Sequence, residues 1–174
     1  MITGFKNIRV NKMKIIGILI LLFLATDAYS QTVAVRPIGT SVKNGAHYLN
    51  MRVWNCTNND IEVPLSELPW GMRTLGLVIY PGGKLAGEPL KESFPVGDSP
   101  STEIKIHAKG YVDGEIPLDQ RFFDITRYEK DGNLLVFWEY DLSWITGGKS
   151  EIVGGMIPLN GKKASDAEHG VACK

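Results

Sequence analysis

Hydrophobic and polar residues alternate along much of the chain. In segment 47–56, Asn50 and Arg52 lie between apolar residues at every second position, which are Leu49, Met51 and Val53. The same period of two recurs in segments 73–80 and 102–108, whose apolar positions are Leu75, Leu77 and Ile79 in the first and Ile104, Ile106 and Ala108 in the second. Successive side chains of a strand point to opposite faces, so these segments predict half-buried β-strands.

Turn-forming residues separate the alternating segments at short intervals. Gly and Asn tolerate the positive φ that tight turns require, and Asp and Pro favour turns for related local reasons. We therefore expect turns at Asn44–Gly45, Asn58–Asp60, Pro81–Gly83, Asp113–Gly114, Asp131–Gly132, Gly147–Gly148 and Asn160–Gly161.

The region from Phe122 to Leu159 predicts three consecutive antiparallel strands. Two β-rich arms, 122–128 and 134–144, are joined through residues 129–133, and the chain then turns at 145–150 and runs back. Even spacing in the second arm predicts that three aromatic residues share its core-facing side, namely Trp138, Tyr140 and Trp144. Short helical turns are expected only in segments 117–124 and 165–170.

About eight or nine short strands without a long helix favour an all-β fold. We expect an antiparallel β-sandwich, with a barrel as the alternative. The general layout resembles the immunoglobulin-like sandwiches of secreted proteins. The resemblance concerns architecture alone, because the Cys, Trp and Cys spacing of true immunoglobulin domains is absent. The long connection 81–101 is either a functional loop or a crossover between sheets.

The N-terminal region has the layout of a secretory signal peptide. Its apolar run, Ile15–Ala25, is shorter than the roughly 20 residues that a membrane-spanning helix needs. Small residues in Ala28–Ser30 suit cleavage before Gln31, and four basic residues precede the run, namely Lys6, Arg9, Lys12 and Lys14. We expect residues 1–30 to be removed, residues 31–174 to form one β-sandwich domain with a C-terminal tail, and the mature protein to be periplasmic or secreted without a membrane span.

Charge argues against a nucleic-acid partner. The whole chain has 19 basic and 19 acidic residues, and the leader holds four of the former and one of the latter, so cleavage moves the formal net charge from +0 to −3. Nucleic-acid binding needs a clustered positive field. The only tight basic pair in the mature chain is Lys162–Lys163.

Two cysteines, Cys56 and Cys173, remain after cleavage. Disulfides form and persist outside the cytoplasm, so a bridge that pins the C-terminal tail to the domain is expected. Closing such a long loop contributes roughly 4–5 kcal/mol in the chain-entropy model. The alternative is a buried thiol at Cys56 with Cys173 free or paired to another chain.

No motif identifies a catalytic or cofactor-binding site. Gly147–Ser150 resembles the end of a phosphate-binding loop, but Ser143 occupies the position of its first glycine. His47, His107 and His169 lie far apart in the sequence. The first two are assigned to polar positions of expected strands, where they are either solvated or meet across a sheet as a metal site. Serine-hydrolase and zinc-protease motifs are absent, so neither enzymatic activity nor a cofactor is expected.

The segment 66–74 is the best candidate for a partner-binding surface. Trp70, Met72 and Arg73 have the composition of an interface hot spot, but for Trp70 the preferred interpretation is a plug at one end of the sandwich. We expect a non-enzymatic binding protein whose partner is another envelope or secreted protein, as in inhibitors, immunity proteins or envelope accessory subunits. The alternatives are a small hydrolase or metal-dependent enzyme and a carbohydrate-binding module that stacks Trp70 and Tyr111 on sugar rings. The oligomeric state stays open.

Overall fold

The computed structural model describes residues 32–71, 74–83, 87–93, 102–129, 134–159 and 173. The expected leader, the turns at Asp131–Gly132 and Asn160–Gly161, and the expected helical turn at 165–170 lie outside these residues. Within them, no helix is both long and apolar enough to cross a membrane.

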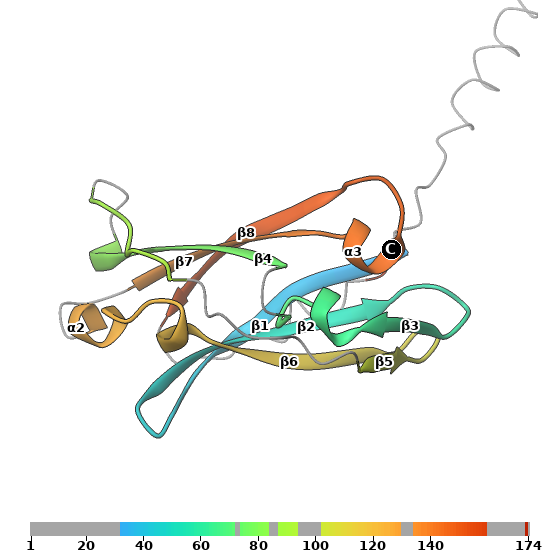
Figure 1. Ribbon diagram of the computed structural model, residues 1–174, viewed down its shortest axis with the longest axis horizontal. Helices are drawn as coiled ribbons and strands as arrows, with labels where there is room; N and C mark the ends of the chain where they lie inside the picture. The colour runs from blue at the N-terminus through green and yellow to red at the C-terminus, as the bar shows by residue number, and fades with distance from the viewer. Residues whose placement is uncertain are drawn as a thin grey trace, which may run out of the picture.

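Antiparallel strands dominate the described chain, which confirms the all-β prediction (Figure 1). One sheet has the order β1-β2-β6, a second pairs β3 with β5, and a third has the order β4-β7-β8, with no sheet closed into a barrel within the described segments. The strands are β1 (Val33–Lys43), β2 (Ala46–Asn55), β3 (Ile61–Pro64), β4 (Leu75–Tyr80), β5 (Glu103–Ile106), β6 (Tyr111–Pro117), β7 (Leu134–Asp141) and β8 (Ile152–Leu159). The connections include short helical turns, which are η1 (Leu65–Glu67), η2 (Pro81–Gly83), η3 (Leu118–Gln120), α2 (Ile125–Glu129) and α3 (Ser143–Thr146).

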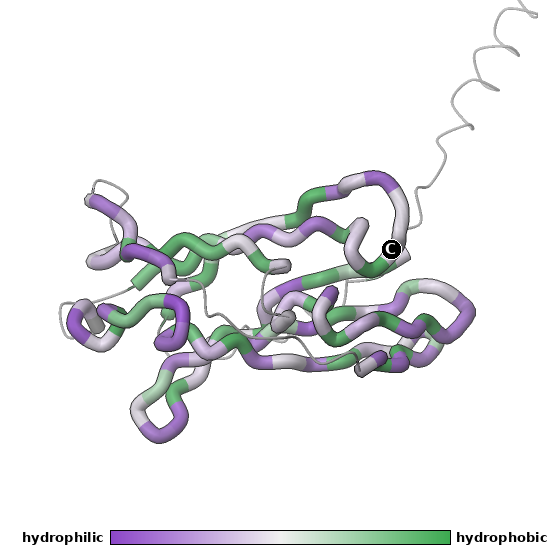
Figure 2. The backbone as a smooth tube through the Cα atoms, in the orientation of Figure 1, coloured by the Kyte–Doolittle hydropathy of each residue, from purple (hydrophilic) through white to green (hydrophobic). Residues whose placement is uncertain are grey.

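The sheets share one hydrophobic core. Strand β2 contributes Leu49, Met51 and Val53, each with none of its surface exposed, so the predicted alternation of this strand is confirmed. Strands β4 and β7 contribute to the same cluster through Ile79 and Val136, among others. Figure 2 shows hydrophobic residues recurring along the strands of both three-stranded sheets. Their burial together joins sheets that share no backbone hydrogen-bond ladder.

The hairpin between β1 and β2 confirms the predicted turn at Asn44 and Gly45. Both residues have positive φ, 51° and 80°, and they form a two-residue loop between Lys43 and Ala46. Such loops match the right-handed twist of the flanking strands. Strand β1 itself carries no alternating signal, because Pro37 interrupts it and the register shifts between Pro37 and Gly39. Strand β1 is an edge strand in the described sheet β1-β2-β6, and proline within a sheet is tolerated mainly on edge strands.

The predicted strand 122–128 is wrong. From Ile125 onward the chain forms α2, and Phe122 and Ile125 are both buried in the core. Their spacing of three places both side chains on one side of a helical turn, and the N–H of Ile125 donates to the carbonyl of Phe122. The true neighbours of β7 are β4 and β8, so only its predicted pairing with the segment 151–159 is confirmed.

The predicted strand face of three aromatic residues is confirmed for Trp138 and Tyr140 and wrong for Trp144. The first two are 7% and 1% exposed, whereas Trp144 is 49% exposed in α3. Strand β7 ends at Asp141, whose Oδ1 accepts the N–H groups of Ser143 and Glu151. This carboxylate therefore redirects the chain into a helical turn before Trp144 can continue the strand.

The contacts of Asp141 predict a specific loss of stability in acid. The hydroxyl of Ser150, followed by the N–H of Ser143, holds the pKa of Asp141 down at about 2, against about 3.9 for an unfolded chain. A lowered folded-state pKa means that this contribution is complete above pH 4 and is lost as the pH falls from 4 to 2. Thermal melts of Asp141→Asn should show a lower Tm at neutral pH and a shallower fall over that interval than the parent. Parallel curves for the two proteins would contradict the assignment.

Candidate functional site

Trp70 lies against the core rather than standing free on the surface. It is partly buried beside the core cluster, and its indole lies over Gly114 of β6. A Cβ on Gly114 would be 1.9 Å from Cδ2 of Trp70, so only glycine leaves room for the ring. The predicted turn at Asp113–Gly114 is wrong for this reason, since both residues lie within β6. This packing supports the plug interpretation, and Met72 and Arg73 lie outside the described residues.

A methyl group at Gly114 should therefore destabilise the fold through Trp70. We expect Gly114→Ala to lower the free energy of unfolding by about 1–3 kcal/mol, the usual cost of overpacking. In a Trp70→Ala background the same change should cost almost nothing, because the colliding ring is gone. Urea unfolding of the four proteins measures this coupling. Equal losses in both backgrounds would show that the glycine is needed for another reason.

His47 and His107 do not meet in a shared site, and His169 lies outside the described residues. His47 is 1% exposed, so its predicted polar position is wrong. It lies two residues before Leu49 and hence on the same core-facing side of β2, where the carboxylate of Asp119 accepts its backbone N–H and contacts Nδ1. His107 is exposed and meets a different carboxylate, 3.4 Å away. Among the described residues no three His, Cys, Asp or Glu side chains are grouped to hold a metal ion.

The predicted bridge between Cys56 and Cys173 is confirmed. Their Cα atoms are 5.2 Å apart, and the bond joins residues separated by 117 positions. Cys56 is 4% exposed and packs beside Ala34 and Trp54. The bridge therefore fastens Cys173 to the end of β2, and neither cysteine remains as a free thiol.

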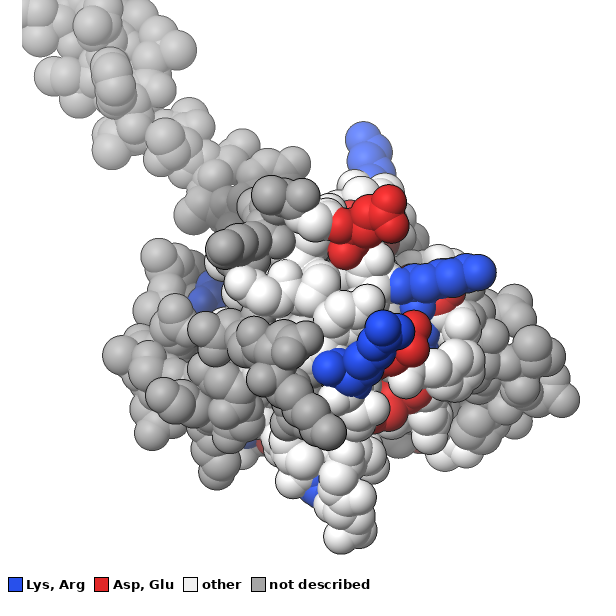
Figure 3. Space-filling model, turned by 90° about the vertical axis from the view of Figure 1, so that its left-hand side faces the viewer, with Lys and Arg blue, Asp and Glu red and all other residues white. Residues whose placement is uncertain are grey.

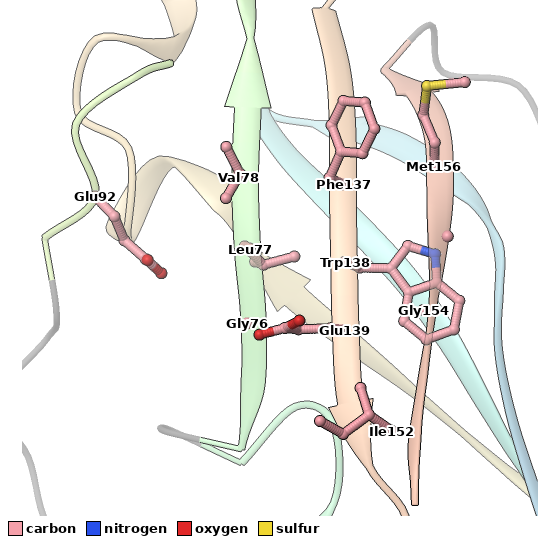
Figure 4. A pocket seen from close by; sticks show the side chains of 11 residues that line it. Gly76, Leu77, Val78, Glu92, Phe137, Trp138, Glu139, Ile152, Gly154 and Met156 are labelled. Atoms are coloured by element: carbon pink, nitrogen blue, oxygen red, sulfur yellow. The ribbon is translucent and has the colours of Figure 1, made fainter. Parts of the chain in front are cut away.

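A hollow lies on the sheet β4-β7-β8 (Figure 4). Its volume is about 720 Å³, which is within the size range of ligand-binding clefts. Its lining comes from all three strands and from Glu92. Glu92 belongs to the segment 87–93, which lies beside β4 at the edge of the sheet. The surface of this sheet is therefore the candidate functional site.

Strand register makes this surface apolar. Val78, Phe137 and Met156 form one row across the three strands, and Ile152 lies two rows further along, opposite Asp141. Val78, Met156 and Ile152 are 40%, 55% and 67% exposed. Outward faces of antiparallel sheets are usually polar. Exposed apolar side chains gathered in this way are typical of interaction surfaces.

Glu139 is the charged residue in the middle of this surface. It lies in the row between two glycines, Gly76 of β4 and Gly154 of β8, and its side chain leans over Gly76 (Figure 4). A Cβ on Gly76 would be 2.7 Å from Cγ of Glu139. The hollow thus exists because neighbouring strands carry no side chain there. None of the described residues forms a hydrogen bond or ion pair with the Glu139 carboxylate in the structure.

This surface escaped sequence-based reasoning. The outward positions of β7, which include Glu139 and Asp141, indicate a mostly polar face when the strand is considered alone. Apolar neighbours come from β4 and β8, whose register is a tertiary property. The available signal was the presence of glycines inside two strands, at Gly76 and Gly154, where strands normally exclude glycine.

A buried ion pair secures the rim of the hollow. Arg121 is 5% exposed, and its guanidinium donates to Oε1 of Glu92 and to the carbonyl of Leu75, the latter at 2.8 Å. Two backbone hydrogen bonds hold the same segment. The N–H of Leu90 donates to the carbonyl of Ile79, and the N–H of Ser93 donates to the carbonyl of Arg121. The predicted long connection therefore runs, in its described part, along the edge of β4.

The outer face of the sheet β1-β2-β6 has a different character. Arg52 forms a paired hydrogen bond with Asp113, at 2.6 and 2.7 Å, and lies 3.8 Å from the ring centre of Tyr111. This guanidinium covers a ring face that sugar stacking would require. Figure 3 shows that charges of both signs also lie side by side at one end of the molecule. Among the described residues, neither the outer face of the sheet β1-β2-β6 nor this end of the molecule carries charges of a single sign.

Comparison with known proteins identifies no relative from which a function could be transferred. No protein-family model matches the chain, and no curated protein has a significantly similar sequence.

Proposed function

We propose that this protein is an exported, non-enzymatic binding protein whose partner docks on the hollowed face of the sheet β4-β7-β8. The proposal rests on one observation, the cluster of exposed apolar side chains around the 720 Å³ hollow. Such a face is costly to leave in water, and its burial against another protein is the usual source of binding energy. The partner is another envelope or secreted protein, which fits an inhibitor, immunity or envelope accessory role.

Two features support export to the periplasm or the outside of the cell. The disulfide between Cys56 and Cys173 suits an oxidising compartment. The basic N-terminal residues and the short apolar run have the pattern of a cleavable leader. In this proposal the three sheets belong to an immunoglobulin-like sandwich, with the hollow on an outer face.

The composition of the hollow also supports binding rather than catalysis. A catalytic site needs polar groups that converge on a reacting atom. The carboxylates in the described lining are those of Glu139 and Glu92, and the second is neutralised by Arg121. The remaining lining is apolar or glycine, as an interface core requires.

Site-specific photocrosslinking tests this proposal in the native host. A photoreactive amino acid replaces Met156 on the proposed surface, and a second version carries it at Glu103, an exposed residue of β5. A discrete adduct with another protein should form from position 156 and not from position 103. Adducts of equal yield from both positions, or from neither, would reject docking on this face.

A further inference from the structure

The Glu139 carboxylate sets the charge that the hollow accepts. It lies among apolar side chains without a basic partner in the described part of the chain, in contrast to Glu92, which faces Arg121. An apolar ligand alone would cover this carboxylate and leave it unpaired, which costs free energy. A Lys or Arg side chain on the ligand would pair with it instead, and such charge-assisted bonds gain strength as water is excluded.

The positions of the apolar side chains set the spacing of the ligand. Phe137 lies two residues before Glu139 on β7, and Ile152 lies one row beyond Glu139 on the opposite side (Figure 4). Two residues of a strand span about 7 Å, so Phe137 offers an apolar contact at about that distance on one side of the carboxylate. On the other side, Ile152 of β8 offers an apolar contact beside Asp141, the β7 residue in the same row. An extended ligand chain aligned with β7 presents alternate side chains to the sheet at the same interval.

We infer that the partner docks through an extended segment with a central Lys or Arg and an apolar residue two positions away on each side. This inference rests on the proposed function. The basic side chain pairs with Glu139. One apolar side chain packs on the row of Val78, Phe137 and Met156, and the other packs on Ile152.

Charge disfavours two other occupants. Two copies of the chain facing each other through this surface would bring their Glu139 carboxylates together, and like charges across an interface are costly. Anionic lipid headgroups would meet the same repulsion. Both occupants lack the cation that the centre of the hollow requires.

Peptide display on the folded, disulfide-bonded mature chain tests the inference directly. A library of about ten randomised residues is selected against the parent and against Glu139→Lys, with Glu103→Lys as the control for an equal charge change elsewhere. The parent and the control should enrich the pattern apolar, any residue, Lys or Arg, any residue, apolar. The Glu139→Lys protein should enrich Asp or Glu at the centre. Selection without a central basic residue, or without this reversal, would overturn the inference.

The affinity of one selected peptide for the parent and for a Glu139 variant measures how much the carboxylate contributes to binding. Fluorescence anisotropy should show about tenfold weaker binding to Glu139→Gln, as expected for loss of one charge-assisted pair, with an unchanged Tm for the variant. Unchanged affinity overturns the inference, as does a dimer in light scattering that is lost when Met156 is replaced by Ser.

Failure of the inference and failure of the proposed function give different results. If the photocrosslinked adduct at position 156 forms with equal yield in the parent and in Glu139→Lys, the docking face stands and its charge selectivity is rejected. If no adduct forms at position 156, the docking face itself is rejected.

Discussion

Replacing both cysteines, Cys56→Ser with Cys173→Ser, is expected to lower the free energy of unfolding by about 4–5 kcal/mol. The bridge closes a loop between residues separated by 117 positions, and its main effect is to restrict the unfolded chain. A loss of this size is a large part of the stability of an ordinary domain. Urea unfolding of the mature chain, followed by circular dichroism, measures it.

The parent protein after reduction is the matched control for the cysteine variant. The two should unfold at the same urea concentration, because both lack the bridge. A variant with less than about 1 kcal/mol of loss would show that the unfolded chain is already compact between these residues.

Removing the guanidinium of Arg121 is the second change with a large expected effect. Arg121→Met should lower the free energy of unfolding by about 3–5 kcal/mol, because it leaves the Glu92 carboxylate unpaired in a largely buried position. It also removes the donor to the carbonyl of Leu75, at the edge of β4. Denaturant unfolding and amide exchange of residues 87–93 both report the loss.

The double variant Arg121→Met with Glu92→Leu separates the charge from the packing. An apolar pair of similar size should recover most of the stability, since replacing both members of a buried ion pair is often close to neutral. If the double variant is as unstable as Arg121→Met alone, the stability depends on a contact of the guanidinium other than Glu92, such as the carbonyl of Leu75.

Local sequence signals predicted the strands that have one apolar face. In β2 the alternation around Leu49, Met51 and Val53 needs no tertiary information, because strand geometry alone sends these side chains to one side. The same holds for β4. The Asn44–Gly45 turn was predictable because its conformation depends on two residues with positive φ.

Errors arose where contacts distant in sequence decide the outcome. Gly114 has the local character of a turn residue, yet it is a strand position cleared for Trp70, more than 40 residues earlier. Segment 122–128 has β-forming residues, but burial of Phe122 and Ile125 favours a helical turn there. In both cases packing outweighs a local preference of about 1 kcal/mol per residue.

The candidate site shows the same division. Sequence reasoning directed attention to Trp70, since a tryptophan at a turn has the composition of a hot spot. Glu139 carries no comparable signal, because one acidic residue on an outward strand position is ordinary. Its significance comes from Gly76 and Gly154, which strand pairing places on either side of it.

The amino-acid sequence by itself determined the all-β character of this protein, the faces of its regular strands and the tight β1–β2 turn, because these depend on neighbours within a few residues. The pairing of Cys56 with Cys173 was the preferred of two possibilities until the structure brought the cysteines together. Only the tertiary structure decided the strand order β4-β7-β8 and thereby the apolar hollow around Glu139. The physical reason is that a binding surface on a sheet is assembled across strands, and register between strands is set by the packing of the whole core.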